Sequence, residues 1–166
     1  DAEKKIAGTS GVNEGPCVLY NEKTGLYYLL VSVGSYNDAS YSVVQSVAYS
    51  PMGPFRKLTL EEGGVLLSNY ANGASNVVVS PGHNSVVRIG DQLAICYHSI
   101  INYIHGAARG VRVDRMLYTE NGNGMQVLYA NGPTKSPQLK FYGADMDYKN
   151  IIGDATVSVQ SETGVN

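Results

Sequence analysis

The chain consists of short apolar segments separated by turn residues, and this alternation constrains its fold more than any other feature. β-Branched and aromatic residues occur in runs of strand length, and no long window has the spacing of a helix. The expected strands are residues 17–20, 26–33, 41–49, 65–67, 77–79, 85–89, 92–99, 111–119 and 125–130. Strand, turn, tyrosine-rich strand, loop and strand follow one another about twice, which is typical of four-stranded units in tandem. The sequence therefore predicts an all-β fold of the β-propeller type.

Two motifs place a polar side chain beside glycine and proline. The first is Asn13-Glu14-Gly15-Pro16, in which Pro16 lacks an amide proton and has a fixed φ, so Glu14 cannot lie inside a helix. The second is Ser80-Pro81-Gly82-His83-Asn84-Ser85, in which Gly82 permits a close backbone approach or an unusual φ. We expect both motifs to form tight turns at strand ends, with Glu14 and His83 in a polar site.

Composition sets the outer limits on function. The 166 residues are enough for one domain with a core of its own. A net charge of −2 and a charged fraction of 16% leave no basic stripe, which argues against nucleic acid as a partner. No apolar stretch approaches the roughly 20 residues that span a bilayer. Cys17 and Cys96 lie in apolar runs and are expected to be small buried side chains, not parts of a disulfide framework.

Several motifs in one order resemble glycoside hydrolase family 43, a family of five-bladed β-propellers that act on glycans containing arabinose, xylose or galactose. The resemblance extends from Thr9 to Gln138. It rests on residues 13–16, 25–29, 41–55, 81–87, 97–98, 112–116 and 132–138. Glu14 matches the position of the family's general acid, which protonates the leaving oxygen while a second carboxylate activates water. From the residues alone, a glutamate before Gly-Pro is more often a surface turn residue.

The resemblance also implies a metal site. His83 matches a family histidine near the propeller axis, which lies by a metal ion, usually calcium, or by waters that replace the ion. Calcium prefers oxygen ligands, so a lone imidazole implies that waters complete the shell and that the ion is structural or electrostatic. A buried, hydrogen-bonded histidine at a turn is the alternative. His98 is expected to pack, and His105 is expected to be exposed.

Substrate contacts are expected from arginine and from one loop. The family keeps an arginine beside its carboxylates, where a fixed guanidinium stabilises charge and binds hydroxyls. Arg109 and Arg112 are both candidates. Arg112 and Asp114 lie on the same side of the expected strand, so a structural ion pair competes with either role. Tyr36 and Asn37 are expected to line the pocket.

The resemblance implies an incomplete site. The family's general base and a further functional aspartate lie in earlier blades, upstream of this sequence. Residues 1–138 therefore resemble the C-terminal half of the propeller, about two blades, and the N-terminal half is expected in the same or a separate chain. Residues 139–166 are expected to form a linker and the start of a β-sandwich accessory domain. The first residues contain no signal peptide and are expected to be an interior cut or a processed terminus.

The function implied by the resemblance is inverting hydrolysis of an oligosaccharide or polysaccharide. The enzyme would be similar to an arabinofuranosidase, xylosidase or galactosidase, and this chain alone would be inactive. A secreted, periplasmic or cell-surface bacterial location goes with such a substrate. Two alternatives stay open because the base is missing: a non-catalytic glycan-binding module, and a structural half without a site of its own.

Overall fold

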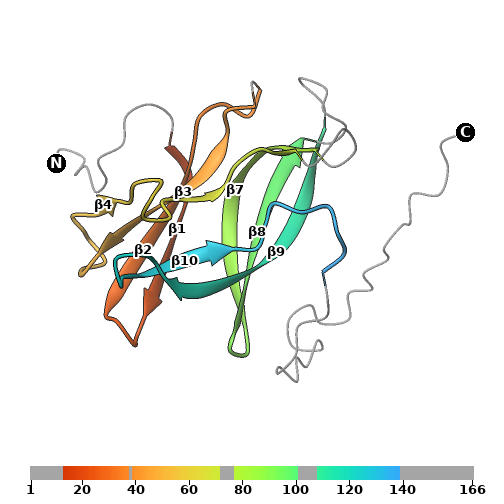
Figure 1. Cartoon of the computed structure of the whole chain (residues 1–166). Coiled ribbons are helices and arrows are strands. Elements are labelled where there is room, and N and C mark those ends of the chain that lie inside the picture. Colours follow the sequence, from red (N-terminus) through yellow and green to blue (C-terminus); the bar gives the residue numbers. More distant parts are fainter. Residues whose placement is uncertain (1–12, 38, 72–76, 101–107, 139–166) are drawn as a thin grey trace, which may run out of the picture.

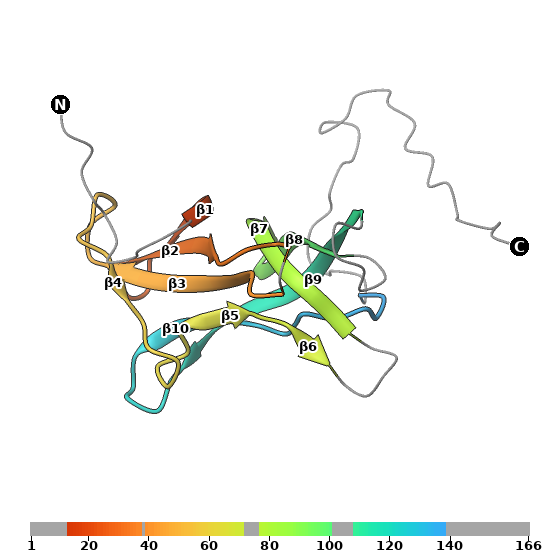
Figure 2. The same ribbon diagram turned by 90° about the horizontal axis from the view of Figure 1, so that it is seen from above.

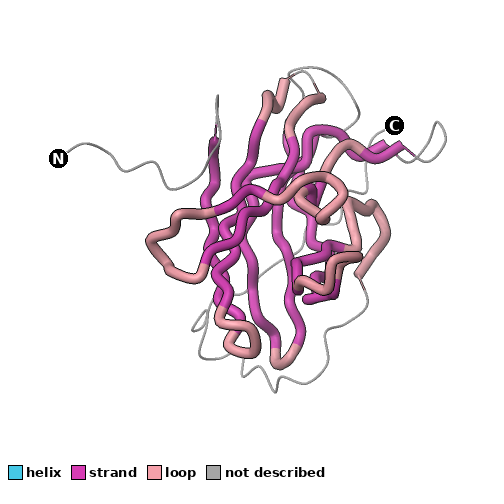
Figure 3. The backbone as a smooth tube through the Cα atoms, turned by 60° about the vertical axis from the view of Figure 1, so that its left-hand side comes forward, coloured by secondary structure: helices cyan, strands magenta, loops and turns pink. Residues whose placement is uncertain are grey.

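The computed structural model describes residues 13–37, 39–71, 77–100 and 108–138, and all regular structure in these ranges is β-strand (Figures 1 and 3). The strands are β1 (Asn13–Asn21), β2 (Leu26–Val33), β3 (Ser42–Ala48), β4 (Arg56–Lys57), β5 (Val65–Leu67), β6 (Tyr70–Ala71), β7 (Val77–Ile89), β8 (Gln92–Ile100), β9 (Arg109–Glu120) and β10 (Gln126–Ala130). The predicted all-β class is confirmed. The described residues contain no helix that is long and apolar enough to cross a membrane.

The strands form two antiparallel sheets. The first sheet has the order β1-β2-β3-β4, with β5 paired to β3. The second sheet has the order β10-β9-β8-β7-β6. Strand β7 of the second sheet contacts β1, β2 and β3 of the first, and β5 lies beside β10 when the molecule is seen from above (Figure 2). The sheets therefore face each other as neighbouring units, as the repeated sequence pattern predicts.

One hydrophobic core fills the space between the sheets. The first sheet contributes Leu30 and Val43, and the second contributes Ile95; none of the three is exposed to solvent. Full burial of such a side chain contributes about 1.5–3 kcal/mol to folding. Gln45 joins the sheets inside this core, because its Nε2 donates to the carbonyl oxygen of Leu128 over 2.8 Å and its Oε1 accepts from the Leu128 amide over 3.1 Å. The relative position of the sheets is thus fixed by apolar packing and by a buried amide.

The two motifs expected to form turns are bulges inside strands. Glu14 belongs to β1, whose register against β2 shifts between Glu14 and Cys17. The second motif belongs to β7, whose register against β8 shifts twice, on either side of Gly82. The predicted strands 77–79 and 85–89 are therefore one strand, and the expected turn between them is wrong. A bulge accommodates an extra residue and turns side chains toward new directions without ending the strand.

Positive φ values mark both bulges. They are 53° at Gly15, 52° at Ser80 and 52° at His83. A left-handed backbone at the non-glycine residues costs of order 1–3 kcal/mol each and persists where the surrounding structure holds it. Residues 139–166, expected to form a linker and the start of an accessory domain, and the loop that contains His105 lie outside the described residues.

Candidate functional site

Both motifs meet at one place, where β1 and β7 pack against each other. A β-carbon added to Gly15 would lie 3.0 Å from Cα and 3.2 Å from Cγ of His83. Glu14 is opposite Ser32 in the β1–β2 ladder, and the backbone amide of His83 donates to Oγ of Ser32 over 2.7 Å. Residues far apart in sequence therefore form one polar cluster, as the sequence predicts for Glu14 and His83.

Tyr41, directly before β3, holds the carboxylate of Glu14. Its hydroxyl donates to Oε2 of Glu14 over 2.7 Å, and the tyrosine is only 2% exposed. Burial, together with the hydrogen bond to Glu14, raises the pKa of Tyr41 to about 12. Tyr41 therefore keeps its proton, and remains a hydrogen-bond donor, at neutral pH.

The ring of Tyr41 occupies the space that a side chain at position 82 would fill. A β-carbon on Gly82 would lie 2.0 Å from Cε1 of Tyr41. His98 is the partner of Gly82 across the β7–β8 ladder, and its ring stacks on that of Tyr41 with centroids 5.7 Å apart and an interplanar angle of 10°. The absence of a side chain at Gly82 thus allows a residue of the first sheet to pack onto a strand of the second.

His98 packs, as the sequence predicts, and its neighbours also affect its pKa and its tautomer. The guanidinium of Arg109 lies 3.2 Å from its Nε2. Burial, followed by the charges of Arg109 and His83, lowers the pKa of His98. Because arginine can only donate, Nε2 of a neutral His98 is the acceptor and the proton is assigned to Nδ1. His98 is therefore neutral near pH 7 and adds no positive charge to the cluster.

Arg109 brings a loop of the first sheet to the cluster. Its guanidinium carbon lies 4.8 Å from the ring centroid of Tyr36, a cation–π contact with a side chain that is 42% exposed. Asn37 follows Tyr36 in the same loop and is exposed; its backbone amide donates to Oγ of Ser35 over 3.2 Å. Arg109 thus contacts both Tyr36 and His98.

Arg112 belongs to a different group of contacts. Its guanidinium donates to Oγ of Ser99 and to the carbonyl oxygen of Thr134. Asp114, which is fully buried, accepts from the hydroxyl of Tyr97 over 2.5 Å and from the amide and hydroxyl of Thr134. These contacts tie β8 and β9 to the segment after β10. Of the two candidate arginines, the structure therefore places Arg109, and not Arg112, beside the cluster.

The acidic side chains of the described residues other than Glu14 have different surroundings. Asp114 is enclosed in the network around Thr134, and Glu62 forms an ion pair with Arg56 over 2.9 Å. Glu22 and Asp91 lie at the hairpin ends of β1 and β7. Within the described ranges, Glu14 is thus the one carboxylate that the Tyr41 and His83 contacts bring into the cluster.

The donor set around His83 does not suit calcium by itself. His83 is exposed and its ring lies 6.2 Å from that of His98, and imidazole nitrogen is a poor ligand for calcium, which prefers oxygen. Among the described residues no group of three histidine, cysteine or acidic side chains is placed to hold a metal ion.

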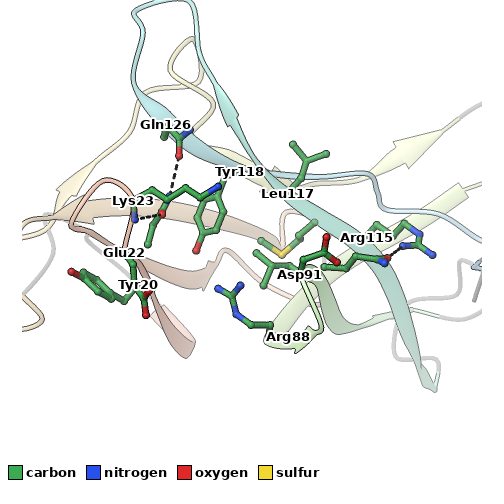
Figure 4. Close-up of a pocket in the computed structure, with 13 residues that line it drawn as sticks. Tyr20, Glu22, Lys23, Arg88, Asp91, Arg115, Leu117, Tyr118 and Gln126 are labelled. Carbon is green, nitrogen blue, oxygen red and sulfur yellow. Dashed lines mark hydrogen bonds between the residues drawn. The ribbon is translucent and has the colours of Figure 1, made fainter. Parts of the chain in front are cut away.

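A separate cavity lies at the opposite ends of the strands. It has a volume of about 830 Å³ and is lined by hairpin residues of both sheets, with Tyr20, Arg88, Asp91 and Tyr118 around it (Figure 4). Tyr20 is six residues along β1 from Glu14, so the two regions are about 20 Å apart. The cavity contains no residue of the Glu14 cluster.

Sequence reasoning did not assign roles to Tyr41 and Ser32. Both are in the expected strands, where a tyrosine and a small polar residue look like ordinary strand positions. Tyr41 could have been noticed because a tyrosine whose body is apolar and whose tip is polar usually has a hydrogen-bond partner when buried. Nothing in the sequence shows that this partner is Glu14.

Comparison with known proteins gives consistent results. Residues 2–123 match the model of glycosyl hydrolases family 43. A β-D-galactofuranosidase of Aspergillus niger is 39% identical over 116 residues, which are 68% of this chain and 31% of that protein. The chain therefore spans about a third of the length of this relative.

Solved structures show the same fold. A thermostable family-43 glycoside hydrolase is 34% identical with a TM-score of 0.63, over 80% of this chain and 39% of that one. An endo-1,5-α-L-arabinanase from Thermotoga petrophila is 23% identical with a TM-score of 0.58, over 78% of this chain and 33% of that one. These neighbours are five-bladed β-propellers, and the described residues form part of that fold.

Proposed function

The chain belongs to glycosyl hydrolases family 43, and on this premise we propose that it supplies the general acid of an inverting glycoside hydrolase. The acid is Glu14. The observation that supports this role is the placement of one carboxylate at the junction of two sheets, with Oε2 bound by Tyr41 over 2.7 Å. Glu14 is exposed, so a leaving oxygen of a bound glycan can approach its other oxygen.

The reaction needs a second carboxylate. In an inverting glycosidase one carboxylic acid protonates the leaving oxygen, and a carboxylate on the opposite side of the sugar activates water. The chain covers 39% of the thermostable family-43 structure. We therefore assign the general base to the remaining blades, in the same or a separate chain, and expect this chain to be inactive without them.

Arg109 and Tyr36 are the proposed substrate contacts, together with Asn37. A guanidinium donates to sugar hydroxyls, and an exposed tyrosine ring packs against the apolar face of a sugar. Arg109 reaches both His98 and Tyr36, so it lies between the cluster and the exposed loop. Arg112, the other candidate from the sequence, donates to Ser99 and Thr134 and is the less suited of the two.

The proposed substrates are glycans with arabinose, galactose or xylose units. The relative from Aspergillus niger is a galactofuranosidase, and one structural neighbour is an arabinanase. A panel of 4-nitrophenyl α-L-arabinofuranoside, β-D-galactofuranoside and β-D-xylopyranoside identifies the sugar. Proton NMR of the first product then shows its anomeric configuration. An inverted anomer supports the proposal, whereas a retained anomer contradicts it.

Two further properties stay predictions. A calcium ion at His83 requires oxygen ligands in addition to the imidazole, and the metal content of the complete protein with and without His83→Ala tests it. A location outside the cytoplasm follows only from the expected polysaccharide substrate, and fractionation of the source cells tests it.

A non-catalytic glycan-binding protein is the alternative function, and it predicts sugar binding in calorimetry with no product over days.

A further inference from the structure

We propose that Tyr41 is a positioning residue for Glu14, and that the packing of its ring against Gly82 and His98 holds it in place. The proposal rests on the function proposed above, in which Glu14 donates the proton. It adds an explanation of how the carboxylate of Glu14 is held in one position.

Two buried hydroxyl groups lie behind the carboxylate of Glu14. The amide of His83 donates to Oγ of Ser32 over 2.7 Å, so the Ser32 hydroxyl keeps its own proton for another partner. Ser32 is fully buried and lies close enough to the Tyr41 hydroxyl to lower the pKa of Tyr41. Tyr41 in turn donates to Oε2 of Glu14 over 2.7 Å. The two buried hydroxyls of Ser32 and Tyr41 therefore lie between the backbone of His83 and the carboxylate of Glu14.

The Tyr41 ring has little freedom to leave this position. Gly82 lies against one part of the ring, and the ring of His98 stacks on it at 5.7 Å. Because the ring is held by packing, its hydroxyl is held as well, and Oε2 of Glu14 stays in one place. The proton to be transferred is then on Oε1, the oxygen that Tyr41 does not contact.

The hydrogen bond from Tyr41 to Glu14 is stronger in the transition state than in the ground state, in which Glu14 is still protonated. As Glu14 gives up its proton, negative charge develops on its carboxylate, and a hydrogen bond to a charged oxygen is stronger than one to a neutral acid. A donor fixed in advance lowers the barrier without reorganisation at the moment of reaction. Tyr41 stays protonated at working pH, since burial and Glu14 raise its pKa to about 12.

The leaving-group dependence of the rate distinguishes this role from a structural one. The test uses the complete protein with phenyl and 4-nitrophenyl glycosides of arabinofuranose or galactofuranose, whichever sugar the enzyme accepts. Tyr41→Phe keeps the ring and removes the hydroxyl. We expect kcat/KM on the phenyl glycoside to fall about 10- to 100-fold, the range for a lost hydrogen bond to a charged group. The 4-nitrophenyl glycoside, which needs little proton donation, loses much less.

Two further variants sharpen the test. Ser32→Ala leaves the Tyr41 hydroxyl but removes the polar group beside it, so it shows the same selectivity with a smaller loss. Tyr97→Phe is the matched control, because Tyr97 also donates to a carboxylate, that of Asp114, but in the other network. It should show no selectivity between the two glycosides.

The double variant Glu14→Gln/Tyr41→Phe separates the two proposals. If Tyr41 acts through Glu14, it adds no loss to that of Glu14→Gln alone. A selective loss in Glu14→Gln with none in Tyr41→Phe overturns the role of Tyr41 and keeps Glu14 as the acid. Equal losses on both glycosides in Tyr41→Phe, or an additive loss in the double variant, also overturn it. Absence of a selective loss in Glu14→Gln overturns the proposed function, and the Tyr41 role with it.

Discussion

Gly82 lies directly against the ring of Tyr41, so close that a β-carbon at position 82 would be 2.0 Å from Cε1. Strand β7 of the second sheet therefore has no side chain at the point where the tyrosine directly before β3 packs against it. The position of Tyr41, and through it that of Glu14, depends on this missing side chain.

Gly82→Ala should therefore affect stability and activity together. An added methyl group forces the Tyr41 ring or the β7 backbone to move, which costs about 1–3 kcal/mol in free energy of unfolding. Denaturant unfolding measures this loss, and activity on a poor leaving group should fall as well. Gly122→Ala is the control, because nothing lies within 4 Å of a β-carbon there. Equal stability of the two variants would contradict the packing described for Tyr41.

Asp114 should matter for folding and not for chemistry. Its buried carboxylate accepts from Tyr97, Thr134 and Gln138, and removal leaves these donors without an acceptor. We expect Asp114→Ala to lower the free energy of unfolding by about 2–4 kcal/mol. The exposed Asp91→Ala should change it by less than about 0.5 kcal/mol. A folded, stable Asp114→Ala protein without activity would instead indicate a role in the reaction.

His98 should make the fold sensitive to acid. Burial, Arg109 and His83 lower its pKa below the ordinary value of 6.5. Between this lowered pKa and 6.5 the unfolded chain binds more protons than the folded one, so stability falls as the pH drops through that interval. Denaturant unfolding at several pH values checks the slope, which His98→Gln should reduce. An unchanged slope in that variant would assign the acid sensitivity to other groups.

The sequence predicted strands and the family better than it predicted local backbone. Strand β2 was predicted to the residue, because its apolar run lies between two clear turns. The Gly-Pro and Pro-Gly pairs were interpreted as turns, but each occurs inside a strand as a bulge. Glycine and proline indicate an irregular backbone, but they do not show whether the strand continues after the Gly-Pro or Pro-Gly pair. That depends on pairing with distant residues.

Prediction of the site was limited in the same way, because the site also depends on contacts between residues far apart in the sequence. Glu14 and His83 were predicted to share a site; the structure packs their two bulges together, and the roles of the two side chains stay predictions. Strand periodicity puts Arg109 and Arg112 on opposite faces of β9 but does not show which face meets the Glu14 cluster, since that depends on packing against distant residues. The role of Tyr41 could not be predicted from the sequence either, because Glu14, Gly82 and His98, which contact it, belong to three different strands.

The most direct test of the account is the activity of Glu14→Gln in the complete protein on an unactivated glycan. A general acid contributes typically 10²- to 10⁴-fold to the rate. The account predicts a loss in kcat of about this size on the glycan, with a far smaller loss on the 4-nitrophenyl glycoside. Full activity on the unactivated glycan would contradict the assignment of Glu14 as the proton donor.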